Sequence, residues 1–250
     1  AERLRAYYSK KLGLNYVEIG RKEQDCRAKR ITAYLDLVYD IVHDKFENLK
    51  SLSIQKGNDL YKYFELLPDT SLLKQAFLKL NEGDYLPESI KDQMIPGELE
   101  VNIMTKLDRQ HYDKEGNELP HSFNDAHSGL RGYANSKLNS GLVLSAGLNA
   151  MSRRGDGCLP NSYPDENNNL DKKIILKVSD YRSALVQGKF LAKKGIWVSE
   201  YRIESGLNCG GHAFATDGIL AGPILEDFKI NKQVLIDSVH EVLVKALLDL

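Results

Sequence analysis

The stretch from Ile196 to Gly218, IWVSEYRIESGLNCGGHAFATDG, is the one around which the rest of the chain is organised. Its first part, from Trp197 to Ile203, repeats β-forming residues with a period of two, which is typical of a strand. Its second part is a loop from Glu204 to His212 that contains three glycines. Glycine accepts positive φ angles and lets backbone N–H groups approach an anion closely. The stretch therefore predicts a strand that ends in a phosphate-binding loop, with the imidazole of His212 beside it.

The balance of charge argues against two classes of partner. The 250 residues include 34 basic and 35 acidic side chains, which gives a formal net charge of −1. Binding to nucleic acid or to an anionic membrane surface is therefore not expected. No apolar run is long enough to span a bilayer, and the first residues lack the apolar core of a secretory signal. We expect a cytoplasmic protein that binds a small-molecule substrate and has the option of forming a homo-oligomer.

The spacing of cysteines and histidines argues against a disulfide framework and against a metal site. Cys26, Cys158 and Cys209 are odd in number, widely separated and outside any CxxC motif. Four histidines also lack the i, i+4 or HExxH spacing of zinc ligands: His111, His121, His127 and His212.

Residues 1–95 predict a mainly helical accessory region. Apolar residues recur every three or four positions between Ile31 and Leu49, which indicates one long amphipathic helix. A second helix is expected from about Leu60 to Leu67, and Ser71 is expected to cap a third.

From residue 96 to residue 250, short β-like runs alternate with helical or loop segments. The four candidate strands are Glu98–Thr105, Gly141–Ala146, Lys173–Ser179 and Trp197–Glu204. The clearest intervening helix runs from Asp180 to Gly195, and a last amphipathic helix is expected from Asn231 to Leu250. Repeated β-α-β units predict a parallel sheet, either doubly wound or part of a (β/α)₈ barrel.

An α/β architecture of this kind places functional groups at the carboxyl ends of the strands. The candidates there are Asn102, Ser145, Gly147, Lys177, Glu204, Ser205, Gly206, Gly210, Gly211 and His212. Lys177 lies inside an otherwise apolar strand, where an unpaired ammonium is costly. Its expected role is either to neutralise an electron-rich ligand or to point to solvent or pair with a carboxylate such as Glu204.

The order of four segments resembles the nitronate monooxygenases and the related flavin-dependent enoyl-carrier-protein reductases. These segments are VNIMT, LVLSAGLN, KIILKVSDYRSALVQGKFLAKKG and IESGLNCGGHAF. Members of the family are FMN-binding (β/α)₈ barrels, also called TIM barrels. The resemblance covers roughly Glu98 to Gly218, and the segment from Gly206 to His212 is its most specific part.

The resemblance implies a role for several residues. Gly210 and Gly211 would approach the flavin, while His212 would take a proton from the carbon next to a nitro group. Asn102 and Lys177 would bind the isoalloxazine or ribityl portion, because a reduced flavin accumulates negative charge that a fixed donor stabilises. Asn208 and Cys209 replace the Glu and Ala that are usual in the family.

The expected function is that of an FMN-dependent oxidoreductase which oxidises nitronates, or a related small substrate with an acidic carbon, using oxygen. An NAD(P)H-dependent flavin reductase of the enoyl type is one alternative. A non-catalytic module that binds a phosphate ligand, or a scaffold, is the other. Neither the family's first strand nor its second phosphate-binding strand has a counterpart here, so we expect an incomplete (β/α)₈ barrel within a longer protein.

Overall fold

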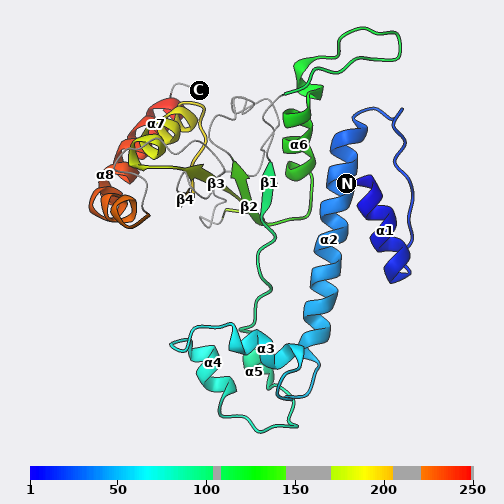
Figure 1. The fold of residues 1–250 in the computed structure, drawn as a ribbon, viewed down its shortest axis with the longest axis vertical. Coiled ribbons are helices and arrows are strands. Elements are labelled where there is room, and N and C mark those ends of the chain that lie inside the picture. The colour runs from blue at the N-terminus through cyan, green and yellow to red at the C-terminus, as the bar shows by residue number, and fades with distance from the viewer. Residues whose placement is uncertain (104–107, 145–169, 205–220, 249–250) are drawn as a thin grey trace. The chain divides into compact units, whose positions relative to one another are not determined.

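The computed structural model describes residues 1–103, 108–144, 170–204 and 221–248 (Figure 1). Contacts divide the chain into two compact units. The helical unit comprises residues 37–97, and the sheet unit comprises residues 1–36 together with residues 98–250.

The sheet unit contains a parallel sheet of four strands in consecutive order. The strands are β1 (Val101–Ile103), β2 (Ser140–Leu144), β3 (Lys172–Val178) and β4 (Glu200–Ile203). Each lies within or next to one of the four candidate strands, so the prediction of a parallel α/β sheet is confirmed. Val143 and Ile175, on the two central strands, are 3% and 2% exposed, which explains why these strands are almost continuously apolar.

A closed eight-stranded barrel is not observed. The sheet that residues 1–103, 108–144, 170–204 and 221–248 form is open, with β1 and β4 at its two edges. The consecutive order of parallel strands is nevertheless the order that a (β/α) barrel uses.

The side chains of the sheet fall on two faces, because successive residues of a strand alternate in direction. We call the first the helix-covered face; its residues are Val101, Ile103, Ser140, Leu142, Leu144, Lys172, Ile174, Leu176, Val178, Tyr201 and Ile203. We call the second the charged face; its residues are Glu100, Asn102, Gly141, Val143, Lys173, Ile175, Lys177, Glu200 and Arg202.

Three helices lie on the side of the helix-covered face: α6 (Asp125–Ala134), α7 (Tyr181–Ala192) and α8 (Ala221–Leu248). Gly129 of α6 lies against Ile103, and Gly188 of α7 lies against Tyr201. The predicted helix from Asp180 to Gly195 is confirmed: Asp180 accepts the N–H of Ser183 at 2.7 Å as its N-cap. Helix α8 packs along α7 and begins well before the predicted start at Asn231, because Pro223 is tolerated in the first turn of a helix.

A buried lysine ties α6 to the sheet. Lys172 is 2% exposed, and its ammonium donates to the carbonyl oxygens of Tyr133, Ser136 and Leu138 at 3.2, 3.1 and 2.7 Å. Burial lowers the pKa of Lys172 from its ordinary value. Because the three acceptors lie at the end of α6 and just beyond it, the positive charge also interacts favourably with the helix dipole.

The first part of the chain also belongs to the sheet unit. Helix α1 (Glu2–Leu12) is followed by α2 (Cys26–Lys50), whose first half packs against α6. Thr32 donates its hydroxyl to the carbonyl of Gly132 at 2.9 Å, and Gly132 has no side chain to separate the two helices. The predicted long helix is therefore present, and its amino-terminal half supports the helix layer of the sheet.

The helical unit has its own core. It contains the end of α2 with α3 (Asp59–Glu65), α4 (Leu72–Phe77) and α5 (Glu88–Lys91). The rings of Phe64 and Phe77 stack with centroids 3.9 Å apart. Asn58 and Ser71 cap α3 and α4, which confirms the predicted start of the third helix. The buried residues are Phe46, Ile54, Leu60, Phe64, Phe77, Leu86, Ile90 and Met94.

Candidate functional site

Lys177 and Glu204 form an ion pair at the carboxyl ends of the two strands that carry the most specific sequence signals. The Nζ atom of Lys177 lies 2.8 Å from Oε2 of Glu204, and the two side chains are 19% and 28% exposed. Such a sheltered ammonium requires an anionic partner. The carboxylate pairing that the sequence offered as one alternative for Lys177 is therefore present, and it joins β3 to the first residue of the predicted loop.

Asn102 lies on the same face of the sheet as Lys177. In the strand register Asn102 pairs with Val143, and Val143 pairs with Ile175, two residues before Lys177 on β3. Side chains two residues apart on a strand share a face. The structure therefore brings two of the predicted flavin-binding residues to the charged face, although they come from strands separated by β2.

A second ionic group on the charged face was not predicted. Arg202 of β4 donates from Nη1 and Nη2 to the two carboxylate oxygens of Glu100, each at 2.7 Å. It also donates from Nη2 and Nε to Glu200, at 2.8 and 3.1 Å. The hydrogen bonds from Arg202 hold the pKa of Glu100 below its ordinary value, and the two carboxylates raise the pKa of Arg202.

The contact between Glu100 and Arg202 indicates that the sheet is curved. Glu100 immediately precedes β1 and Arg202 belongs to β4, so the two side chains meet across β2 and β3. Neighbouring strands are about 4.8 Å apart, and a flat sheet would hold β1 and β4 too far apart for these side chains to pair easily. The charged face is therefore concave along the line from Glu100 to Arg202.

A third ion pair lies toward the amino end of β3. Lys173 Nζ is 2.9 Å from Oε1 of Glu98, and both side chains are about half exposed, at 45% and 50%. With the other two groups, three cations and four carboxylates lie on or beside the described part of this face. These residues are Lys173, Lys177, Arg202, Glu98, Glu100, Glu200 and Glu204.

The amino terminus of α7 also points to the carboxyl end of the sheet, but it already has an anion. The Asp180 carboxylate accepts from the hydroxyls of Ser179 and Ser183 at 2.7 and 2.9 Å. Burial raises the pKa of Asp180, but these hydrogen bonds and those from backbone N–H groups outweigh it, so the net shift is downward. An anionic ligand is therefore not expected at this helix terminus.

Several predicted site residues lie outside the described residues. They are Ser145, Gly147, Ser205, Gly206, Gly210, Gly211 and His212. Their proposed roles remain predictions from the sequence.

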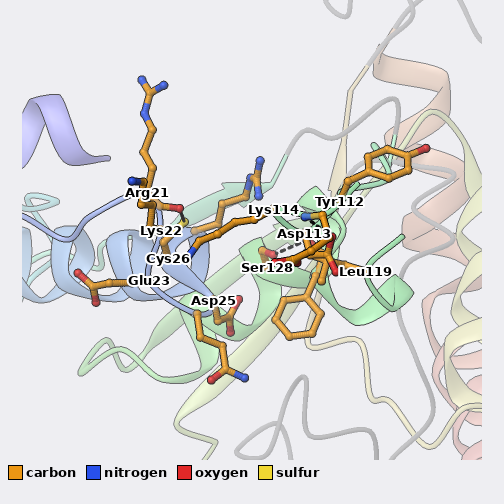
Figure 2. Close-up of a pocket in the computed structure, with 14 residues that line it drawn as sticks. Arg21, Lys22, Glu23, Asp25, Cys26, Tyr112, Asp113, Lys114, Leu119 and Ser128 are labelled. Atoms are coloured by element: carbon orange, nitrogen blue, oxygen red, sulfur yellow. Dashed lines mark hydrogen bonds between the residues drawn. The ribbon is translucent and has the colours of Figure 1, made fainter. Parts of the chain in front are cut away.

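Two cavities lie away from the charged face. The first has a volume of about 500 Å³ and is lined by residues around the start of α2 and by the segment that precedes α6. Figure 2 shows Cys26 and Asp113 among the residues that line it. Two of its carboxylates have partners: Asp25 accepts from Arg131 at 2.7 and 2.9 Å, and Asp113 accepts from the backbone of its own turn. None of the three predicted site residues that the structure describes, Asn102, Lys177 and Glu204, lines this cavity.

The second cavity has a volume of about 390 Å³ and lies between β4 and α8. Its walls include three aromatic side chains, Trp197, Tyr201 and Phe228, together with Leu225 and Ile236. Two lysines of α8 also line it. It belongs to the edge of the sheet rather than to the charged face.

Among the described residues, no group of three or more His, Cys, Asp or Glu side chains could hold a metal ion. His111 instead lies with Nε2 2.7 Å from Oδ1 of Asp125. No helix in the same residues combines the length and the apolar character needed to cross a membrane.

No family model, curated protein or solved structure matches this chain. The geometry of the charged face and the amino-acid sequence of residues 204–212 are therefore the basis for assigning a function. Three residues of the charged face were not predicted as site residues: Glu100, Glu200 and Arg202. Their alternation in sequence could have indicated a charged face, because residues two apart in a strand point to the same side of the sheet.

Proposed function

We propose that the chain is an FMN-dependent oxidoreductase of the (β/α) barrel type, acting on nitronates or on a related small substrate with an acidic carbon. The observation that carries the proposal is the 2.8 Å contact between Lys177 and Glu204. It places a sheltered cation of β3 beside the first residue of the glycine-rich segment 204–212, at the strand ends where enzymes of this architecture bind their ligands.

The residues on the charged face have the chemistry that a flavin requires. The ammonium of Lys177 has three N–H donors, and the carboxamide of Asn102 offers both donors and an acceptor on the same face. When bound, FMN supplies a group that takes electrons from the substrate and passes them to oxygen. Lys177 would stabilise the negative charge of the reduced ring, and Asn102 would orient the ring by hydrogen bonding.

The remaining roles come from the sequence of the loop. Gly210 and Gly211 would admit the cofactor's phosphate or ring close to the backbone, and His212 would accept the substrate proton. Replacing His212 with Ala should then abolish turnover while leaving FMN bound. An unchanged turnover rate in this variant would remove His212 from the mechanism.

The role of the positive charge of Lys177 can be tested by measuring the affinity for FMN and the reduction potential of the bound FMN. Lys177→Met removes a charge-assisted hydrogen bond, a loss of about 1.5–3 kcal/mol, which corresponds to FMN binding weakened by at least tenfold. It should also lower the potential of the bound flavin. Glu204→Gln should have the opposite effect on the potential, because Glu204 neutralises part of the lysine's charge.

Lys173→Met is the matched control, because Lys173 lies on the same strand and the same face but pairs with Glu98 toward the amino end. It should leave FMN affinity unchanged. Equal losses in both lysine variants would contradict a specific role for Lys177. Protein that stays colourless after incubation with FMN would instead favour a non-catalytic binding module.

A separate assay distinguishes nitronate oxidation from the flavin-reductase reaction. Oxygen uptake with propionate 3-nitronate is expected, without consumption of NAD(P)H. Oxidation of NAD(P)H with an unsaturated acceptor, and no oxygen uptake with the nitronate, would assign the chain to the flavin reductases.

A further inference from the structure

Lys177 has a second cation directly beside it on the charged face. In the strand register Lys177 of β3 pairs with Arg202 of β4. Neighbouring strands are about 4.8 Å apart, so like charges at paired positions repel each other unless their head groups diverge. Each of the two side chains therefore needs an anionic partner that draws it away from the other.

The partners of the two cations lie in opposite directions along the sheet. The ammonium of Lys177 contacts Glu204, which follows β4 at its carboxyl end, at 2.8 Å. The guanidinium of Arg202 contacts Glu200 at 2.8 Å and Glu100 at 2.7 Å. Glu200 opens β4 and Glu100 precedes β1, so both lie toward the amino ends of the strands. The ammonium is thus drawn to the carboxyl end of the sheet, and the guanidinium is drawn away from it.

Glu200 and Glu204 occupy equivalent positions with respect to Lys177. They lie two residues before and two residues after Arg202, so each is a diagonal neighbour of Lys177 across the strand pair. The N–H of Glu204 donates to the carbonyl oxygen of Val178 at 2.9 Å, so the pairing of β3 with the chain after β4 extends to this residue. Lys177 nevertheless pairs with Glu204 and not with Glu200. The difference is that Glu200 already accepts two hydrogen bonds from Arg202.

We infer that Arg202 is a positioning residue for Lys177. By holding Glu200, it leaves Glu204 as the carboxylate that Lys177 contacts, and it thereby directs the ammonium to the carboxyl end of the sheet. The glycine-rich segment 204–212 begins at that end. The effect of Arg202 on FMN rests on the proposed function, because that function gives Lys177 its role in binding the cofactor. The effect of Arg202 on the direction of Lys177 does not.

The direction of Lys177 can be tested by urea denaturation of the full chain without cofactor. Because Arg202 is 35% exposed, Arg202→Met is expected to leave the chain folded. While Arg202 is present, Lys177→Met and Glu200→Gln should change the unfolding midpoint additively, because the two residues do not interact. In an Arg202→Met background Glu200 is released to bind Lys177, so the two changes should no longer add. Additive changes in both backgrounds would overturn the inference.

Lys173 is the matched control, because it is the other lysine of β3 that is diagonal to Glu200. It already pairs with Glu98 at 2.9 Å. Lys173→Met and Glu200→Gln should therefore remain additive in the Arg202→Met background. Coupling of Glu200 to Lys173 instead of Lys177 would also overturn the inference.

The effect on the cofactor is measured as the affinity for FMN. Arg202→Met should weaken FMN binding about threefold, because Lys177 is then shared between two carboxylates, and adding Glu200→Gln should restore the affinity. In a Lys177→Met background, Arg202→Met should cause no further loss, because Arg202 acts through Lys177. A loss that is independent of Lys177, or that Glu200→Gln does not rescue, would show that Arg202 acts by its own charge or only supports the fold, and would overturn the inference.

The urea and FMN measurements separate a failure of this inference from a failure of the proposed function. A wild type that binds no FMN, with Glu200 coupled to Lys177 in the Arg202→Met background, would contradict the FMN assignment and support the role of Arg202. FMN binding without that coupling would support the FMN assignment and overturn the role of Arg202.

Discussion

The guanidinium of Arg202 meets both carboxylate oxygens of Glu100, each at 2.7 Å, so the last strand of the sheet is joined to the residue that precedes the first. This bridge crosses two strands on the concave side. It makes the curvature of the sheet testable by mutation.

Loss of the bridge should destabilise the sheet unit. Arg202→Met keeps most of the side-chain length but removes every hydrogen bond to Glu100 and Glu200. Because these side chains are 35% to 50% exposed, the expected cost is on the order of 1 kcal/mol in the free energy of unfolding. Urea denaturation measures this cost. If Arg202→Met causes no further loss of stability in a Glu100→Gln background, the loss is due to the Arg202–Glu100 pair.

The ionised Glu100 should also make the stability of the protein depend on pH in the acidic range. Its pKa lies below the ordinary value of 4.5 because Arg202 donates to it. A carboxyl with a lowered pKa in the folded state contributes stability above its unfolded pKa and loses that contribution as the pH falls through the folded value. The difference in melting temperature between the wild type and Glu100→Gln should therefore be greatest near neutral pH and shrink below pH 4.5. A difference that grows on acidification would contradict this account.

Lys172 should be far more costly to replace than its neighbour Lys173. Lys172→Met removes the ammonium donor from three carbonyl oxygens, of which only that of Tyr133 has other donors among the described residues, the N–H and hydroxyl of Ser136. We expect a loss of roughly 3 kcal/mol in the free energy of unfolding. Lys173→Met removes only a half-exposed ion pair and should cost less than about 1 kcal/mol. Denaturant midpoints of the two variants provide the comparison, and similar values would show that the three carbonyl contacts contribute little.

The contact between α7 and β4 makes Gly188 sensitive to enlargement. A methyl group there would collide with the hydroxyl of Tyr201 and would come within 3.0 Å of Val239, so Gly188→Ala should cost about 1–3 kcal/mol.

Removing the hydroxyl should relieve part of this cost. The Tyr201 hydroxyl is buried and has no hydrogen-bond partner among the described residues, and burial raises its pKa to about 12. Tyr201→Phe should therefore be neutral or stabilising by itself, and the double variant should be more stable than Gly188→Ala. Strict additivity in thermal unfolding would exclude the predicted collision.

The strands were predictable because each repeats apolar residues over a short run, and all four were found within a few residues of their observed bounds. The start of β4 was placed too early. The sequence from Trp197 to Ser199 is as β-forming as the strand itself, but β4 begins only at Glu200. The ring of Trp197 instead packs edge-on against His240, with centroids 6.3 Å apart. Such a tertiary contact is not visible in a local pattern.

The candidate site was predictable in part. The position of Lys177 at a strand end, and Glu204 as its possible partner, followed from the order of residues along two neighbouring strands. The pairing of Arg202 with Glu100 did not, because alternation assigns a residue to a face but does not say how far the sheet curls. The number of strands and the closure of a barrel depend on the same long-range geometry.

The missing side chain of Gly141 has a further consequence for this curvature. A methyl group built there would run into the side chain of Ile175 and would touch Glu100 at 3.8 Å. Space on the concave side is thus shared by β2, β3 and the residue before β1. We expect these three positions to vary together in related sequences, and a redesign that enlarges one of them to succeed only when another is made smaller.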